Sequence, residues 1–137
     1  MSLNECGCSP AEILIFPCSG GSNVGQIANA AAVKLTLDGV GKMFCLAGLG
    51  GHIESMIASA KAARRVVAVD GCGVACARET LQHAGFEVTD HVVVTELGIQ
   101  KQYDLTVPEA EVEKVAKRVR ESLGAIAPTV RAIAAMG

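Results

Sequence analysis

Four short apolar runs alternate along the chain with longer segments that have the pattern of helices. The runs are Ile13–Phe16, Lys42–Phe44, Val66–Val69 and Val92–Val94. Continuous apolar runs of this length, rich in branched side chains, are typical of strands buried on both faces. We expect the helices at about 23–37, 53–62, 73–83 and 106–123, with a last short helix over Thr129–Met136.

Local signals place several of the helix ends. Ser22 or Asn23 can accept hydrogen bonds from the first turn of the first helix, and Asp38-Gly39 ends it. Thr106 to Glu109 has the spacing of a capping box, and it opens a charged amphipathic helix. Arg64 and Arg65 follow the second helix, where positive charge suits its negative end. These signals support helices between the apolar runs.

This alternation predicts a three-layer α/β/α sandwich of the Rossmann-like type, with a mostly parallel sheet of about four strands. Residues 1–137 show no linker or second hydrophobic pattern, so we expect one domain, with 1–10 as an irregular arm. In a parallel sheet the turns after the strands gather at one edge, where ligands usually bind. That edge is the place to look for chemistry.

The composition and charge of the chain argue against several classes of function. The chain is 50% hydrophobic, has a mean hydropathy of +0.39 and carries a formal charge of −2 without runs of like charge. The sequence therefore offers no electrostatic footprint for nucleic acid or anionic membranes, and no apolar run approaches the roughly 20 residues of a membrane span. The N-terminal residues lack the pattern of a signal peptide, so we expect a cytoplasmic protein with reduced cysteines. The Ala-rich segment 126–136 offers a surface for the domain itself or for a second copy, which leaves a homodimer open.

Three cysteines recur at one interval. Cys18, Cys45 and Cys72 are each separated by 27 positions, and each follows an expected strand. If those strands are neighbours, the three thiols lie at one edge of the sheet. Cys76 comes four residues after Cys72, which places both on one face if the helix begins near residue 73. Four thiols at one edge are therefore expected.

Four thiolates are the ligand set of closed tetrahedral zinc sites, and they also hold iron–sulfur clusters. The first hypothesis is therefore a zinc ion bound by Cys18, Cys45, Cys72 and Cys76, with an iron–sulfur cluster as the alternative cofactor. Free cysteine is also common in protein cores, and Cys45 between Phe44 and Leu46 fits that simpler interpretation.

A second hypothesis is a thiol enzyme in which Cys72 is the nucleophile. Cys72 and Arg78 have the Cys-x5-Arg spacing of thiol phosphatases and arsenate reductases, although an exposed helical arginine beside Glu79 explains Arg78 more simply. Redox or sulfur-transfer chemistry would need a resolving thiol, for which Cys6 and Cys8 in the N-terminal arm are candidates.

A third hypothesis is that the glycine turns 20–21 and 48–51 bind phosphate at helix N-termini. The signal is weak, because both turns lack the lysine of a phosphate-binding loop.

Other polar residues near the expected edge are weaker candidates. Asp70 can accept hydrogen bonds from the turn that carries Cys72, or serve only as a turn-forming residue. His52 could be a fifth ligand or a proton carrier, but a surface position at a helix end is the simpler expectation. His83 and His91 are expected at the surface or at helix ends. Glu54 and Glu96 lie near the same edge without forming an acid–base pair.

Three segments carry a family resemblance. Asp70-Gly71-Cys72 with Cys76-Ala77, Phe16-Pro17-Cys18-Ser19-Gly20, and Gly41 to Gly48 around Cys45 resemble the cysteine segments of the DGC-domain family of zinc-binding proteins. The resemblance covers roughly residues 13–120, and it implies that Cys18, Cys45, Cys72 and Cys76 bind zinc. It supplies no reaction, and it does not extend to Cys6 and Cys8.

Overall fold

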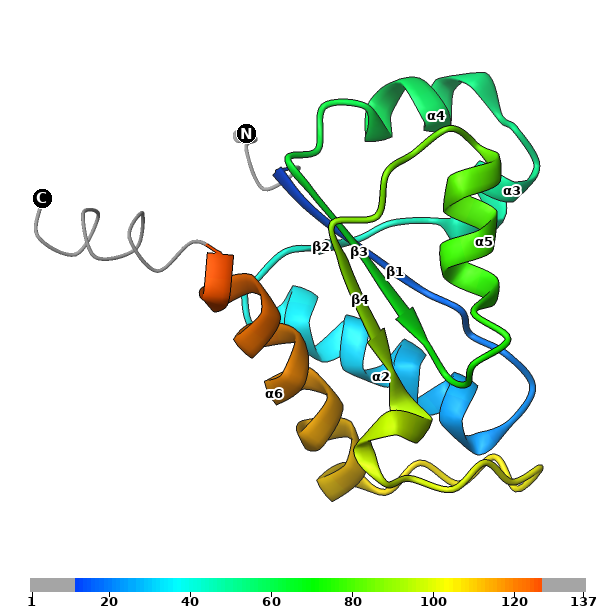
Figure 1. Cartoon of the computed structure of the whole chain (residues 1–137), viewed down its shortest axis with the longest axis vertical. Helices are drawn as coiled ribbons and strands as arrows, with labels where there is room; N and C mark the ends of the chain where they lie inside the picture. Colours follow the sequence, from blue (N-terminus) through cyan, green and yellow to red (C-terminus); the bar gives the residue numbers. More distant parts are fainter. Residues whose placement is uncertain (1–11, 127–137) are drawn as a thin grey trace, which may run out of the picture.

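A computed structural model describes residues 12–126 (Figure 1). The expected N-terminal arm with Cys6 and Cys8, and the expected helix over Thr129–Met136, lie outside the described residues. Among the helices within 12–126, none combines the length and the hydropathy that a membrane-spanning segment requires.

The sheet has four strands, and all of them are parallel, as the alternating pattern predicted. The register pairs Ile15 with Val67 across the two central strands, and Val67 with Asp90 toward one edge. The strand order is β2-β1-β3-β4, so the first three strands in sequence are spatial neighbours. The strands are β1 (Ile13–Pro17), β2 (Lys42–Met43), β3 (Arg65–Asp70) and β4 (Asp90–Val93).

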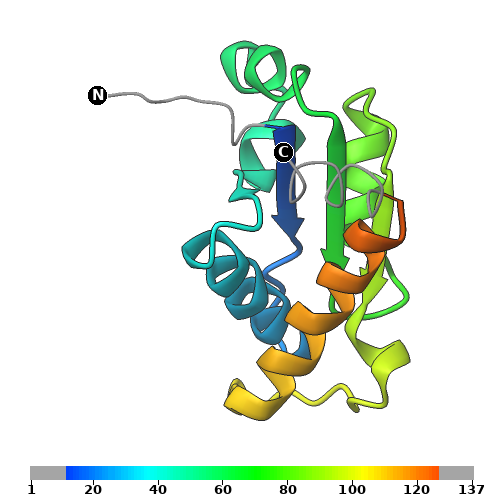
Figure 2. The ribbon, with the colours of Figure 1, turned by 90° about the vertical axis from the view of Figure 1, so that its left-hand side faces the viewer.

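Helices cover both faces of the sheet and form the outer two layers (Figures 1 and 2). On one face α2 and α6 pack on Ile15, Val67 and Val92. On the other face α3, α4 and α5 pack on Leu14, Phe16 and Ala68. The α/β fold is therefore confirmed. The helices are α2 (Asn23–Leu37), α3 (Leu46–Gly50), α4 (Glu54–Ala60), α5 (Cys76–His83) and α6 (Glu109–Ile126), with a short 3-10 turn η2 (Val94–Leu97).

The first helix has the ends that the sequence predicted. The Ser22 hydroxyl accepts a hydrogen bond from the Gly25 N–H at 3.2 Å, and Asp38 follows the last turn. Gly39 then adopts a left-handed backbone, with φ of 77°, which glycine tolerates without strain. This short-range chemistry fixes α2 against the sheet.

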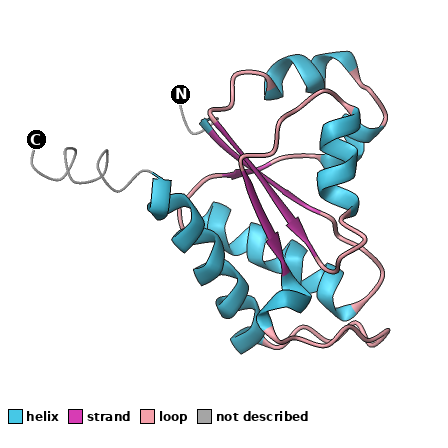
Figure 3. Ribbon diagram, in the orientation of Figure 1, coloured by secondary structure: helices cyan, strands magenta, loops and turns pink. Residues whose placement is uncertain are grey.

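Several expected boundaries were wrong, among them the start of the last helix, which was expected at about residue 106 and lies at Glu109. Residues 46–50, expected as part of a glycine-rich turn, form the short helix α3 (Figure 3). The helix expected from about Gly73 begins only at Cys76, because Ala75 has a left-handed backbone with φ of 59° and ψ of 47°. A helix cannot run through such a residue, so 71–75 remain an irregular turn.

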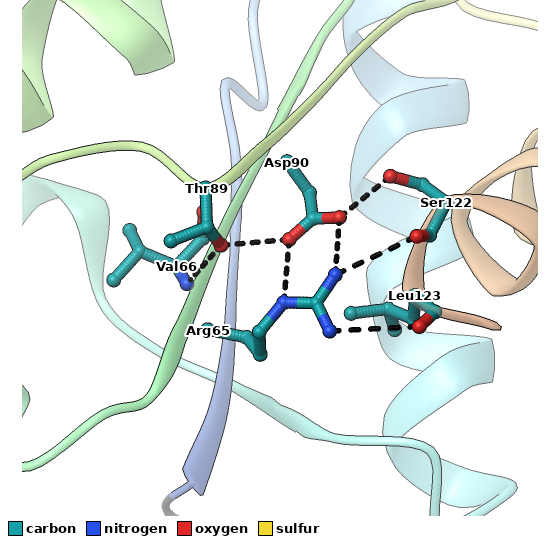
Figure 4. Close-up of polar contacts among 6 residues, drawn as sticks. All are labelled: Arg65, Val66, Thr89, Asp90, Ser122 and Leu123. Atoms are coloured by element: carbon teal, nitrogen blue, oxygen red, sulfur yellow. Dashed lines mark hydrogen bonds and ion pairs between the residues drawn. The ribbon is translucent and has the colours of Figure 1, made fainter. Parts of the chain in front are cut away.

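Arg65 does not end a helix. It begins β3, and its guanidinium forms two hydrogen bonds with Asp90, Nε to Oδ1 at 3.1 Å and Nη2 to Oδ2 at 2.7 Å (Figure 4). The fully buried Asp90 side chain also accepts hydrogen bonds from the hydroxyls of Thr89 and Ser122. Burial by itself would raise the pKa of Asp90, but these hydrogen bonds and the Arg65 charge hold it below its usual value.

We predict that Arg65→Leu lowers the free energy of unfolding by about 3–5 kcal/mol, because it leaves the Asp90 carboxylate buried without its counter-ion. Since the native pKa of Asp90 is lowered, its contribution to stability is present above about pH 4 and is lost as the pH falls through the native pKa. Urea unfolding measured from pH 7 downward should show this loss in the wild type and less of it in R65L.

The neighbouring arginine is the control. Arg64 pairs with Glu12 at 3.4 Å, and both side chains are largely exposed. Arg64→Leu should therefore lower stability by less than about 1 kcal/mol. Equal losses in R64L and R65L would contradict the role assigned to the buried pair.

Candidate functional site

The carboxyl edge of the sheet carries the four cysteines. Cys18 follows β1 directly, while Cys45 and Cys72 each come two residues after the end of β2 or β3. Because β1 lies between β2 and β3, Cys18 lies between the segments that carry the other two. The expectation that the first three strands are neighbours is therefore confirmed, and it explains how an interval of 27 residues returns the chain to one edge.

Close backbone contacts join the turns at this edge. A Cβ added at Gly71 would lie 2.8 Å from the Gly25 nitrogen, and one added at Gly25 would lie 2.5 Å from the Gly20 oxygen. Neither position has room for a side chain. These glycines therefore pack the turns after β1 and β3 against the start of α2.

Hydrogen bonds tie Cys18 to the turn of Cys72. The Cys18 N–H donates to the Val69 carbonyl at 3.0 Å, which extends the pairing of β1 with β3 beyond Pro17. In return, the Gly71 N–H donates to the Cys18 sulfur at 3.3 Å. The middle thiol is thus fixed by the same turn that presents Cys72.

Asp70 organises the start of α5. Its side chain is buried, and its carboxylate accepts hydrogen bonds from the N–H groups of Ala77 at 2.6 Å and Arg78 at 3.2 Å. The sequence had suggested that Asp70 accepts hydrogen bonds from the turn that carries Cys72, but the two backbone donors belong to the first turn of α5. Asp70 thereby satisfies donors that the first turn of a helix leaves free.

His91 is the partner of Asp70 that the sequence did not reveal. It was expected at the surface, but its Nε2 donates to Asp70 Oδ2 at 2.8 Å, and the side chain is only 22% exposed. His91 pairs with Ala68 in the β3–β4 register, so it shares a sheet face with Asp70 two positions further on. Period-two alternation across a correctly aligned β4 would have been the signal.

The relation expected between Cys72 and Cys76 was wrong. Cys72 is not the cap of α5 and does not share a helix face with Cys76. Cys76 is the first residue of α5, Ala75 occupies the cap position, and Cys72 lies in the preceding turn. Cys76 and Cys45 are exposed, whereas Cys18 and Cys72 are half-buried.

The loop before α6 also reaches the carboxyl edge. Lys101 Nζ lies 3.5 Å from Cys72 Sγ. Asn23 holds this loop, since its side-chain amide donates to the Gln100 carbonyl at 2.9 Å and its Oδ1 accepts the Gln102 N–H at 2.6 Å. Lys101 could not be predicted from local sequence signals, because the contact joins residues 29 positions apart in the chain.

The four thiols share an edge, but they are not gathered around one point. Within residues 12–126, no group of three or more His, Cys, Asp or Glu side chains is arranged to hold a metal ion. Cys76 lies close enough to Cys18 to contribute to the raised pKa of the Cys18 thiol. The four-cysteine ligand set therefore stays a prediction.

The remaining candidates have simpler roles. Arg78 lies in α5, and its guanidinium contacts Glu79 at 3.2 Å, as expected for a helical arginine rather than an oxyanion ligand. His52 and His83 contact each other at 3.2 Å, away from the cysteines, at the far ends of α3 and α5. Glu54 begins α4, and Glu96 lies in η2.

Comparison with known sequences identifies the family. The sequence model of the DGC domain matches residues 14–119, which is most of the chain and includes all four edge cysteines. The chain belongs to the DGC domain family. It is also similar to the anaerobic and virulence modulator AnvM of Pseudomonas aeruginosa, with 35% identity over 100 residues, or 72% of this chain and 76% of the relative. No solved structure matches it.

We predict that Cys18 reacts with iodoacetamide more slowly than Cys45 in the metal-free protein. Burial raises the pKa of the Cys18 thiol, and the charges of Asp70 and Cys76 raise it further against the lowering effect of the Gly20 and Gly71 N–H groups. Less thiolate is then present near neutral pH, whereas Cys45 is exposed. Mass spectrometry of each alkylated peptide across a pH series measures both rates.

The pH dependence of the alkylation rate distinguishes restricted access to Cys18 from the raised pKa of its thiol. Access alone would slow Cys18 at every pH, whereas its raised pKa also moves the midpoint of the rate profile above that of an ordinary thiol. A Cys18 that alkylates as fast as Cys45, with an ordinary midpoint, would contradict this assignment.

Proposed function

We propose that the carboxyl edge binds one zinc ion through the thiolates of Cys18, Cys45, Cys72 and Cys76. The observation that carries the proposal is the placement of these cysteines after three adjacent parallel strands and at the start of α5. Membership of the DGC domain family supports it, since all four cysteines lie within the matched residues. An iron–sulfur cluster is the alternative occupant of the same thiols.

The four thiolates are a suitable ligand set for zinc, but the present spacing of the four sulfurs does not fit a zinc ion. Four thiolates are a standard ligand set for structural zinc. With Zn–S bonds of about 2.3 Å, tetrahedral geometry requires sulfurs about 3.8 Å apart, and the described residues show no such cluster. Binding therefore requires the four thiols to come closer together than they lie in this structure.

Two contacts at this edge favour thiolates, although burial on balance raises the pKa of Cys18. The Gly71 N–H already donates to the Cys18 sulfur, and N–H donation stabilises a thiolate more than a thiol. Lys101 brings a positive charge to Cys72. Asp70 holds the start of α5, and with it Cys76, in place through backbone hydrogen bonds.

The site could support structure, metal handling or sensing, and we favour sensing. The relative AnvM is named as a modulator. Cys45 and Cys76 are exposed, so both metal ions and oxidants can reach the site from solvent. A closed four-thiolate site leaves no position for a substrate, which argues against catalysis by the bound metal.

Elemental analysis of protein purified without added metal should find about one zinc per chain. The double variant Cys72→Ser/Cys76→Ser should lose it, because hydroxyls do not replace thiolates as zinc ligands. Zinc that binds the folded but not the unfolded chain should also raise the melting temperature of the stripped protein.

The chain supplies its own matched control. Cys6→Ser/Cys8→Ser removes two cysteines outside the segment matched by the family, and it should retain zinc. Stripped wild-type protein that stays metal-free when offered zinc, with an unchanged melting temperature, would overturn the proposal. Iron and sulfide found in place of zinc would assign the site to a cluster.

A second candidate function is a thiol enzyme with Cys72 as nucleophile. The observation that favours it is the ammonium group of Lys101, 3.5 Å from the Cys72 sulfur. A nearby cation stabilises a thiolate, and the thiolate is the reactive form. Arg78, the arginine of the Cys-x5-Arg spacing, adds no support for this function, because its guanidinium contacts Glu79.

Alkylation of the stripped protein tests this candidate. A nucleophilic Cys72 should displace iodide from iodoacetamide several-fold faster than a free model thiol at pH 7, and Lys101→Met should remove the advantage. Lys117→Met, which removes an exposed lysine on α6, is the control. A Cys72 that reacts no faster than the model thiol would exclude this function.

A further inference from the structure

Two histidines contact each other at the ends of α3 and α5, each helix having a cysteine at its other end. His52 Nε2 lies 3.2 Å from His83 Nδ1, and both side chains are exposed. The two rings meet edge to face, with centroids 5.2 Å apart. Two segments far apart in the chain thus bring two exposed ring nitrogens to within 3.2 Å of each other.

The backbone holds both histidines in place. His83 is the last residue of α5, and His52 follows the end of α3 with a left-handed backbone, φ of 56°. The His52 N–H donates to the Leu49 carbonyl at 3.1 Å. The helices approach closely, since a Cβ added at Gly50 would lie 3.2 Å from Thr80 Cγ2. The separation of the two rings is therefore set by helix packing.

This separation matches two ligands of one metal ion. Zn–N bonds of about 2.0–2.1 Å in tetrahedral geometry place neighbouring ligand nitrogens about 3.3 Å apart. Neutral imidazole is a ligand for Zn²⁺, Cu²⁺ and Ni²⁺, through either ring nitrogen. A shift of one ring proton to its far nitrogen would free both lone pairs.

The surroundings suit an open site. Of the two histidines, His83 lines an open depression, together with Gly50, Glu79, Thr80 and Gln82. Glu79 adds negative charge one helical turn before His83, although Arg78 contacts it. The protein supplies two ligands, and water would complete the coordination.

We propose that His52 and His83 form a second, solvent-open binding site for a divalent transition-metal ion, separate from the cysteine edge. The site does not rest on the proposed function, because it uses no thiol. Its two helices nevertheless also carry cysteines at their starts, with Cys45 as the cap of α3 and Cys76 as the first residue of α5. The two sites thus share one packed pair of helices.

The probe is zinc chloride added to the stripped full-length protein, followed by NMR of the histidine ring nitrogens. We expect His52 Nε2 and His83 Nδ1 to shift toward the values of metal-bound imidazole, and His91, engaged by Asp70, to stay unchanged. His52→Asn/His83→Asn should lose one equivalent of zinc relative to the wild type. Since the cysteines are common to both proteins, the difference isolates the pair.

Gln82→Ala, which removes another side chain of the same depression, is the control and should bind as the wild type does. Unshifted ring nitrogens, or equal zinc binding by wild type and double variant, would overturn the site and leave a hydrogen-bonded pair that only fastens α3 to α5. If the ring nitrogens shift while Cys72→Ser/Cys76→Ser retains all its zinc, the cysteine site fails and the histidine site stands.

Discussion

One buried carboxylate holds the carboxyl edge together. Asp70 ends β3, accepts two N–H groups from the start of α5 and pairs with His91 on β4. A charged group this deeply buried is stable only if its hydrogen bonds are made. The three contacts therefore fix a strand, a helix and a neighbouring strand relative to one another. They also explain why the first residue of the Asp-Gly-Cys motif is an aspartate.

The next two residues of the motif have separate physical reasons. Gly71 packs against the backbone of α2 where no Cβ fits, and its N–H reaches Cys18. Cys72 then turns toward solvent and Lys101. The motif thus combines a buried anchor, a close backbone contact and a presented thiol. A second charged cluster, Arg65 with Asp90, fixes β3, β4 and α6 toward the opposite edge of the sheet.

Much of the fold could be predicted because its signals are local. The apolar runs of β1 and β3, the cap at Ser22 and the stop at Asp38 follow from neighbouring residues. The adjacency of the first three strands was a condition of the 27-residue argument, and the strand order meets it. The missed features depend on tertiary contacts or unusual backbone. The left-handed Ala75 delays the start of α5, and Arg65 begins a strand and pairs with Asp90, 25 residues away. The contacts of His91 and Lys101 join residues 21 and 29 positions apart.

The cysteine segments are not equally well attached. Cys18 leaves a central strand, whereas Cys45 follows β2, an edge strand of two residues whose pairing is extended by one hydrogen bond from Phe44 to Ile15. Phe44 adds an edge-to-face contact with Phe16, at 5.8 Å between centroids. With two paired positions, β2 has fewer backbone contacts to oppose local opening than the five paired positions that join β1 to β3. Local opening of the Cys45 segment would therefore require the Phe44 ring to leave Phe16, but it would not require the two central strands to separate.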